Sequence, residues 1–121
     1  MKSYKQSEQD YLESILVLSR EKEVVHRIDV AKREEVSQAA VNKAVKLLVQ
    51  QNYVYEDGKH LYLTEKGKAY AESVYAVHCT VREFLQTIGV SAVQAEEDAC
   101  KMEHLVSQET ISAMRKFLEK K

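Results

Sequence analysis

The stretch "SQAAVNKAVKLLVQQNYVYEDGKHLYLT", residues 37–64, decides the fold of this chain. Its second half predicts a β-hairpin, because two alternating runs, 53–56 and 59–63, flank the turn-forming pair Asp57-Gly58. Its first half predicts an amphipathic helix capped by Ser37, because apolar residues recur every three or four positions. These apolar positions are Ala40, Val41, Ala44, Val45 and Leu48.

The residues before this stretch predict the rest of a helix-turn-helix. Asp29 is expected to cap a brief helix that runs through Arg33, after the short extended segment "VVHRI" at 24–28. A turn of three or four residues then leads into the helix that begins at Ser37. Upstream, residues 7–20 have the spacing of another amphipathic helix, with Ser7 as its cap. A hairpin directly after a helix-turn-helix is a wing.

The residues after the hairpin are predicted to be helical. Thr64 is expected to cap a long helix that ends near Gly89, and two more helices are expected at about 91–106 and 108–119, the second capped by Ser107. The fold class is therefore mainly α, a winged helix-turn-helix lobe followed by an all-helical lobe. We place the boundary between residues 1–73 and 74–121.

Composition excludes several classes of protein. The chain has 121 residues, 45% of them hydrophobic, which suits one domain or two small lobes with a shared core. No signal segment and no long apolar run is present, so we expect a soluble, cytoplasmic protein with no membrane partner. Two cysteines are too few for a disulfide scaffold, so Cys79 and Cys100 are expected to be reduced, with Cys79 packed.

Charge is unevenly distributed along the chain. The net charge is −1, yet residues 27–46 carry +2 and residues 91–110 carry −4. The first region is suited to phosphate and the second to cations.

Three metal-binding residue types lie close together near the C-terminus. On a helix, Cys100, Glu103 and His104 occupy positions i, i+3 and i+4, so a thiol, a carboxylate and an imidazole can converge on one ion. Asp10 and Glu13 share a helix face in the same way. Taken singly, each has a simpler explanation, such as a packed cysteine or an acidic residue near a helix N-terminus. His78 is expected on a buried helix face, where a core histidine is the alternative to a ligand.

Five motifs together give the chain a likeness to a known family: "DYLESI", "VSQAAVNKAVKLL", "LYLTEKGKAYA", "HCTVREFL" and "DACKMEHLVS". Over nearly its whole length the chain resembles the metal-dependent repressors typified by the diphtheria toxin repressor and the manganese transport regulator. The resemblance implies a homodimer with a DNA-binding lobe at 1–73 and a dimerisation and metal-binding lobe at 74–121. A divalent transition metal would switch on binding to operator DNA and so control metal homeostasis genes. The additional C-terminal domain of longer members is expected to be absent.

The resemblance also implies a set of metal ligands. Cys100 falls where the manganese branch has glutamate and the iron branch has cysteine, so we expect iron(II) or manganese(II) as the effector. Glu96 and Arg82 depart from the iron branch, which argues against its second metal. Arg82 is instead expected to donate to Glu96, Glu97 or Asp98. The implied ligands are Asp10, Glu13, His78, Cys100, Glu103 and His104.

The helix that begins at Ser37 is expected to read DNA. Gln38 and Asn42 carry amides suited to adenine, Lys43 suits guanine or phosphate, and Ala39 suits a thymine methyl. The alternative for the lysines on this helix is simple solvation. The full set of expected DNA contacts consists of Ser37, Gln38, Ala39, Asn42, Lys43 and Lys46 on the helix, and Arg27, Lys59 and His60 for phosphate.

A homodimer is expected from the apolar residues after position 74, which exceed what one short helical lobe can cover. They are Val74, Val77, Val81, Phe84, Leu85 and Ile88, with Phe117 and Leu118 as additions.

Two rival functions remain open at this point. The first is an enzyme, with Cys100 as nucleophile and His104 as its base, or with metal-activated water. No third orienting group accompanies that pair, so no enzyme and no small-molecule substrate are expected. The second is a winged-helix module that binds DNA or protein without metal.

Overall fold

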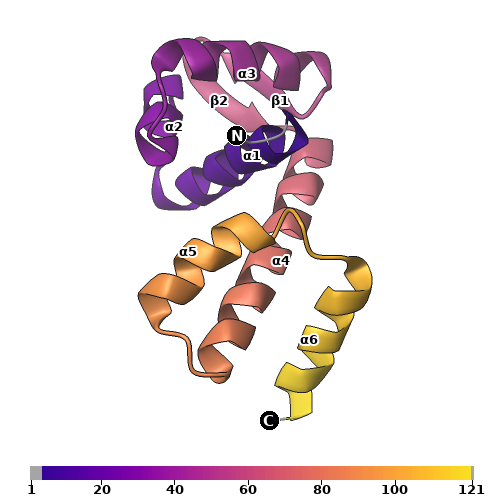
Figure 1. The fold of residues 1–121 in the computed structure, drawn as a ribbon. Helices are drawn as coiled ribbons and strands as arrows, with labels where there is room; N and C mark the ends of the chain where they lie inside the picture. The colour runs from indigo at the N-terminus through magenta and orange to yellow at the C-terminus, as the bar shows by residue number, and fades with distance from the viewer. Residues whose placement is uncertain (1–3, 121) are drawn as a thin grey trace. The chain divides into compact units, whose positions relative to one another are not determined.

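The computed structural model describes residues 4–120, and these form six helices and one two-stranded hairpin (Figure 1). The mainly α, winged helix-turn-helix architecture expected from the sequence is confirmed. The chain divides into two compact units, Met1–Glu72 and Ser73–Lys121. Among the described residues, no helix has both the length and the apolar character needed to cross a membrane. In chain order the elements are α1 (Tyr4–Glu21), α2 (Arg27–Glu34), α3 (Gln38–Gln50), β1 (Val54–Asp57), β2 (His60–Leu63), α4 (Glu65–Thr87), α5 (Ala92–Met102) and α6 (Gln108–Lys120).

The N-terminal unit packs α1, α2, α3 and the hairpin around one apolar core. Ser37 caps α3 as predicted, because its Oγ accepts a hydrogen bond from the Ala40 amide at 3.1 Å. Three residues connect α2 to α3, and Glu35 takes a left-handed conformation there with φ of 56°. The core side chains that are at most 2% exposed include Leu12, Ile15, Val30, Val41, Leu48 and Val54.

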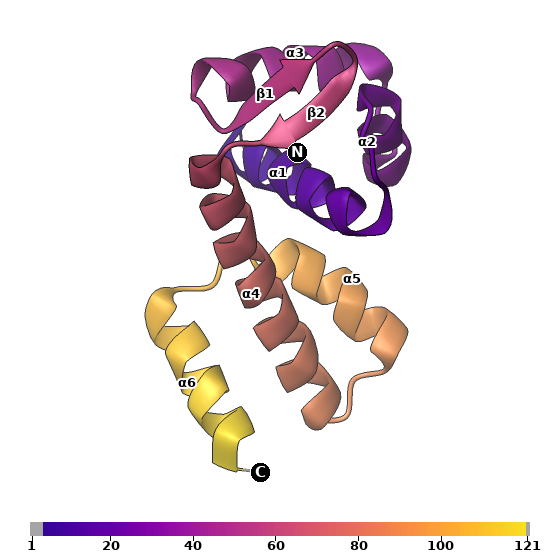
Figure 2. The ribbon, with the colours of Figure 1, turned by 180° about the vertical axis from the view of Figure 1, so that it is seen from behind.

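The hairpin is antiparallel, and its first strand contacts α3 while its second strand contacts α1 (Figure 2). Asp57 pairs with His60, so the two turn residues are Gly58 and Lys59, one position later than predicted. Gly58 takes the positive φ of 64° that this turn requires. The Leu61 amide donates to the Val25 carbonyl at 2.8 Å, which attaches the wing to the segment before α2.

Thr64 begins α4 as predicted, because its Oγ1 accepts from the Gly67 amide at 2.9 Å. Gly67 is required by close approach, since an added Cβ would lie 1.9 Å from the Tyr53 carbonyl oxygen. This contact seats the first turn of α4 against the residue before β1.

Three expected helix ends were wrong. Ser7 lies inside α1, because nothing from Tyr4 to Gln6 breaks the helical pattern. Asp29 is the third residue of α2, and its carboxylate accepts from the backbone amide of His26, the residue that precedes the helix, at 2.8 Å.

The third wrong helix end is the C-terminal end of α5, which lies among the predicted metal ligands. α5 begins after Ser91, whose Oγ accepts from the Gln94 amide at 3.3 Å, and stops at Met102 instead of 106. The next four residues turn the chain toward Ser107, whose Oγ accepts from the Thr110 amide at 3.2 Å, as expected of the cap of α6.

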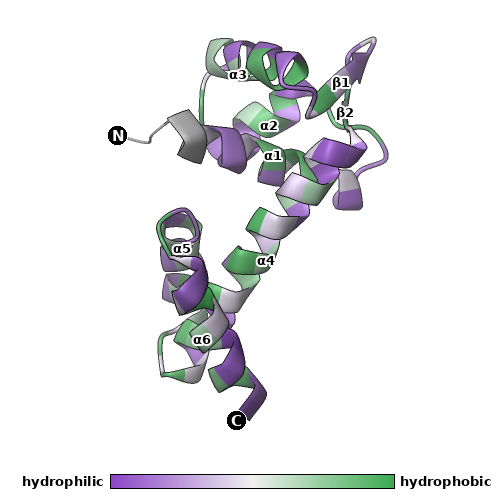
Figure 3. Cartoon of the chain, turned by 90° about the vertical axis from the view of Figure 1, so that its right-hand side faces the viewer, coloured by the Kyte–Doolittle hydropathy of each residue, from purple (hydrophilic) through white to green (hydrophobic). Residues whose placement is uncertain are grey.

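The C-terminal unit has a small core contributed by α4, α5 and α6. The buried members of its main cluster are Val81, Ala99, Ile111 and Met114, and Val74 and Ala95 are buried as well. Figure 3 shows hydrophobic and hydrophilic residues on each of these helices. The core corrects part of the predicted dimer face, because Val81 is 0% exposed and Val77, Phe84 and Leu85 pack against the same cluster. Apolar side chains that remain exposed in this unit are Ile88, Val93, Leu105 and Phe117.

Candidate DNA-binding and metal sites

One face of α3 presents the side chains that the sequence predicts to meet DNA. Ser37, Gln38, Ala39, Asn42 and Lys43 are all exposed, as is Lys46 one turn later. On the wing, Lys59 is exposed and His60 is half-buried. His60 contacts the ring of His26 edge-on, with 5.4 Å between ring centroids. The structure therefore has a face of α3 that carries amides and lysines, near a wing turn that carries Lys59.

Arg27 makes a contact that the sequence did not predict. Its guanidinium donates twice to the Glu56 carboxylate on β1, from Nε at 2.9 Å and from Nη2 at 2.5 Å. Its third nitrogen, Nη1, donates to Asn42 Oδ1 at 2.9 Å. Hydrogen bonding to Glu56 raises the pKa of Arg27 above its usual value. The first residue of α2 is thus joined to both the wing and α3.

A hollow of about 500 Å³ lies between the start of α2, the start of α3 and the wing turn. Arg27, Asn42 and Glu56 line it together with Gln38 and Lys59. The predicted DNA contacts from three separate segments therefore surround one concave surface within the N-terminal unit.

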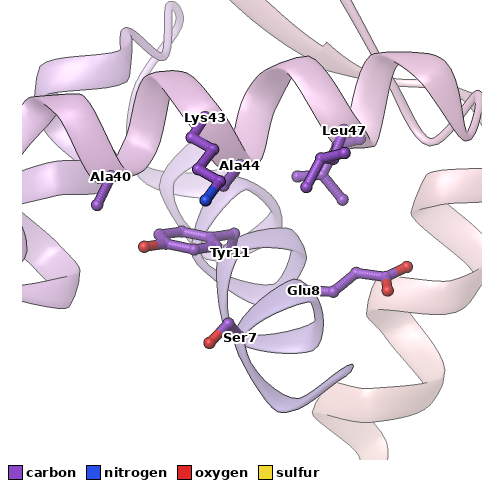
Figure 4. A pocket seen from close by; sticks show the side chains of 8 residues that line it. Ser7, Glu8, Tyr11, Ala40, Lys43, Ala44 and Leu47 are labelled. Carbon is purple, nitrogen blue, oxygen red and sulfur yellow. The ribbon is translucent and has the colours of Figure 1, made fainter. Parts of the chain in front are cut away.

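A second hollow separates α1 from α3 (Figure 4). It is mostly apolar, and Ala40, Ala44 and Leu47 line one side of it. The Lys43 side chain extends toward the ring of Tyr11 in Figure 4. Lys43 is thus one of the lining residues of this hollow, although it is exposed on α3.

His78 is the buried centre of the candidate metal residues in the C-terminal unit. It lies on α4 and is 2% exposed, as the sequence predicted. Its Nδ1 lies 3.4 Å from Glu103 Oε2, and its Nε2 lies 2.7 Å from Glu96 Oε2. Both imidazole nitrogens thus face carboxylates.

Cys100 meets other partners than Glu103 and His104, the two residues that the helical spacing predicts to join it. Its Sγ is 3.7 Å from Glu96 Oε2, and among the described residues it forms a group with His78 and Glu96 whose ligand atoms all lie within 4.8 Å of one another. Glu103, the residue after α5, still has a helical conformation (φ −57°, ψ −25°), and its amide donates to the Ala99 carbonyl at 3.0 Å. His104 Nε2 instead lies 3.5 Å from Glu103 Oε1.

Glu96 is the residue that sequence reasoning missed as a possible ligand. The signal was available, because Glu96 and Cys100 are four residues apart on one helix. Arg82 Nη1 lies 3.2 Å from Glu96 Oε1, which confirms the expected partner of Arg82. Burial alone would raise the pKa of Glu96, but the charges and hydrogen bonds of His78 and Arg82 hold it below its usual value.

Asp10 and Glu13 occupy one face of α1 in the N-terminal unit, three residues apart. Glu13 is 5% exposed, and Asp10 is half-buried. Between α1 and α2, the buried Ser14 hydroxyl accepts from Arg33 Nη1 at 2.7 Å and donates to Glu34. This network holds the adjoining turn of α1 against α2.

The chain matches two family models that together cover most of its length. Residues 4–61 match the N-terminal DNA binding domain of the iron dependent repressors. Residues 64–121 match the metal binding and dimerisation domain of the same family.

Individual relatives agree with these models. An HTH-type transcriptional regulator of Methanocaldococcus jannaschii is 35% identical over 118 residues, which span 95% of this chain and 94% of the relative. The transcriptional regulator MntR of Escherichia coli O157:H7 is 38% identical over 112 residues, 92% of this chain and 72% of MntR. The solved structure of the manganese regulator SloR superimposes with a TM-score of 0.82 at 32% identity over 93% of this chain. The chain spans only about half of SloR, 53% of its length.

Proposed function

The chain belongs to the family of iron-dependent repressors, and from that premise we propose that it represses transcription in response to a divalent transition metal. The observation that carries the proposal is the buried imidazole of His78 between the carboxylates of Glu96 and Glu103. The exposed face of α3 beside the wing supplies the second half of the function, the contact with operator DNA.

The residues present fit a metal of this class. Burial of the Glu103 carboxylate beside His78 is costly unless a positive charge offsets it, whereas Glu96 is partly exposed. Transition metals accept imidazole, carboxylate and thiolate ligands. The proposed ligands are Asp10, Glu13, His78, Cys100, Glu103 and His104. We propose iron(II) or manganese(II) as the effector, because the thiolate favours the softer ion and the carboxylates favour the harder one.

The proposed switch depends on charge. The carboxylates of Asp10 and Glu13 on α1 and of Glu103 beside His78 carry negative charge, which a bound divalent ion would offset. Asp10 and Glu13 belong to the DNA-binding unit, whereas the other four ligands belong to the C-terminal unit. Shared ligation would therefore restrict the orientation of one unit relative to the other. A coupling of about 1 to 3 kcal/mol between metal and DNA is enough for a useful switch.

The proposed assembly on DNA is a homodimer. Two recognition helices related by twofold symmetry suit half-sites about one DNA turn apart. Exposed apolar residues in the C-terminal unit, Ile88, Leu105 and Phe117 among them, supply surface that a second copy can cover. The proposed location is the cytoplasm, where operator DNA is accessible.

We do not propose an enzyme. The Cys100 thiol faces Glu96, while His104 faces Glu103, so the thiol and the imidazole of the rival hypothesis are not a nucleophile and its base. No membrane partner or small-molecule substrate is part of the proposal.

The test is a metal titration followed by fluorescence anisotropy on a labelled operator. Two variants separate the halves of the site. Glu13→Gln removes a charged ligand, so binding is expected to fall and then recover partly as metal is raised. Lys43→Ala removes a DNA contact, so its loss of about 1 to 3 kcal/mol is expected to persist at saturating metal.

The protein for this test is purified without affinity nickel, and its metal content is measured by elemental analysis. Equal operator affinity with and without metal would refute the switch and favour a metal-independent DNA-binding module. A monomer at micromolar concentration under both conditions would refute the proposed assembly.

A further inference from the structure

We propose that Arg27 and Glu56 are positioning residues that orient the side-chain amide of Asn42, so that Asn42 selects guanine. The inference rests on the proposed function, because it takes the exposed face of α3 as the surface that meets DNA. It changes the role expected for Arg27 from phosphate contact to control of a base-reading side chain.

The geometry joins three elements of the N-terminal unit. Glu56 on β1 accepts from Nε and Nη2 of Arg27, and this two-point contact sets the plane of the guanidinium. That plane directs Nη1 to Asn42 Oδ1 at a distance of 2.9 Å. The side chains of Arg27 and Glu56 are 33% and 24% exposed, so the pair is partly protected from water.

Hydrogen-bond chemistry determines which way the amide faces. A guanidinium can only donate, so the Asn42 atom that faces Arg27 must be the carbonyl oxygen. The Nδ2 group therefore points away from Arg27. Asn42 is exposed on α3, and its free end offers two N–H donors to a partner.

This orientation changes the base that Asn42 prefers. A freely rotating asparagine reads adenine by donating to N7 and accepting from the N6 amine, which uses both ends of the amide. In this protein Oδ1 is turned toward Arg27 and already accepts one hydrogen bond, so the end of the amide that faces a partner is the donating Nδ2 group. Guanine offers two adjacent acceptors, N7 and O6, which suit a group that only donates. The predicted preference at this position is therefore guanine instead of the adenine suggested by the sequence.

The orientation of Asn42 by Arg27 depends on the Glu56 carboxylate of the wing. Without its carboxylate, Arg27 would lose the contacts that hold its plane and would be available to a DNA phosphate. With it, the positive charge of Arg27 is largely balanced, and the exposed lysine at the rim of the same hollow, Lys59, is better placed to meet phosphate.

The first experiment tests the contact without DNA or metal. In proton–nitrogen NMR spectra, the Arg27 Nε–H of the wild-type protein is expected to exchange with water about tenfold more slowly than in Glu56→Ala, because the hydrogen bond protects it. Equal exchange rates in the two proteins would overturn the proposal. The Lys59→Met variant, which changes a neighbour in the same hollow, is expected to leave the wild-type exchange rate unchanged.

The second experiment measures base selectivity in the metal-loaded dimer, with operators in which each base pair of the half-site is replaced singly. Asn42→Ala is expected to lose about 5- to 50-fold of discrimination at one guanine. Arg27→Met is expected to lose discrimination at that same guanine, and the double variant is expected to lose no more. Lys59→Met should weaken all operators equally and reduce the salt dependence by about one charge.

The outcomes separate this inference from the proposed function. If Arg27→Met behaves like Lys59→Met, Arg27 is a phosphate contact and the inference is wrong while the repressor function stands. A preference for adenine at the position controlled by Asn42 would also refute it. Operator binding without metal dependence would refute the proposed switch, yet the base profile would still decide the role of Arg27. A protein that binds no DNA would overturn both.

Discussion

The two units of the protein differ in how their functional side chains are placed. α3 carries its candidate DNA contacts on an exposed face that starts at its N-terminus, where Ser37 caps the helix. α5 also begins with a serine cap, at Ser91, but its candidate metal residues lie at and beyond the helix end. Helical spacing predicted the exposed face of α3, which the burial of these residues confirms. It did not predict that Cys100 groups with His78 and Glu96 among the described residues, because that grouping depends on the packing of α4 against α5.

The units also differ in the cores that support these sites. The N-terminal core contains large aliphatic residues from α1, α2, α3 and the wing, including Leu12, Ile15 and Leu48. The buried C-terminal cluster has four members, two of which are Ala99 and Val81. A smaller core leaves less packing energy to offset each lost contact.

The largest expected effect is a loss of stability on substitution in the C-terminal core, the smaller of the two cores. Ile111 is 1% exposed, and Ile111→Ala is expected to lower the free energy of unfolding by about 2 to 5 kcal/mol, because it removes buried apolar contacts and leaves a cavity. Urea unfolding measured by circular dichroism tests this. Lys116→Ala, an exposed change on the same helix, is the control and should stay within about 0.5 kcal/mol. A similar effect of both variants would show that the cluster around Ile111 is not the core of this unit.

The next largest effect is a change of metal preference at the candidate ligands of the C-terminal unit. Cys100→Glu replaces a thiol with a harder carboxylate, so the ratio of manganese(II) to iron(II) affinity is expected to rise by about tenfold. Anaerobic competition titrations with a fluorescent chelator measure the ratio. Cys79→Ser is the control, because Cys79 belongs to none of the metal-type groups among the described residues. An unchanged ratio in Cys100→Glu would show that Cys100 is not a ligand.

The smallest effect concerns the start of α2 in the N-terminal unit. Asp29 accepts from Lys22 Nζ at 2.7 Å and from the His26 amide, and these hydrogen bonds lower the pKa of Asp29. Asp29→Asn is expected to cost about 1 kcal/mol of unfolding free energy at neutral pH. Because the folded pKa is depressed, the stabilisation is present above the unfolded pKa and disappears as pH falls through the folded value.

Urea unfolding at several pH values measures the difference between wild type and Asp29→Asn. The two curves should converge at acidic pH. The exposed change Glu97→Gln serves as the control and should show no such convergence. A difference that stays constant down to the lowest pH would mean that the charge of Asp29 is not what stabilises α2.

The sequence by itself determined the order of the elements and the exposed face of α3. Local rules suffice there, because caps such as Ser37, Thr64 and Ser107 act within three residues, and apolar spacing assigns a helix its buried side. The wing was predictable for the same reason, since Gly58 accepts the positive φ of a tight turn. The buried position of His78 followed from its place in an apolar stripe.

Only the tertiary structure decided which distant side chains meet. Arg27 joins Glu56 and Asn42 across 29 and 15 residues of sequence, and His78 meets Glu96 and Glu103 from another helix. Spacing along one element cannot predict such contacts, because they depend on how separate elements pack and on where a helix stops. Among the described residues, Cys100 groups with His78 and Glu96, a combination that its spacing to Glu103 and His104 along the chain did not predict. A local pattern predicts a helix face, whereas the packing of several elements determines a site.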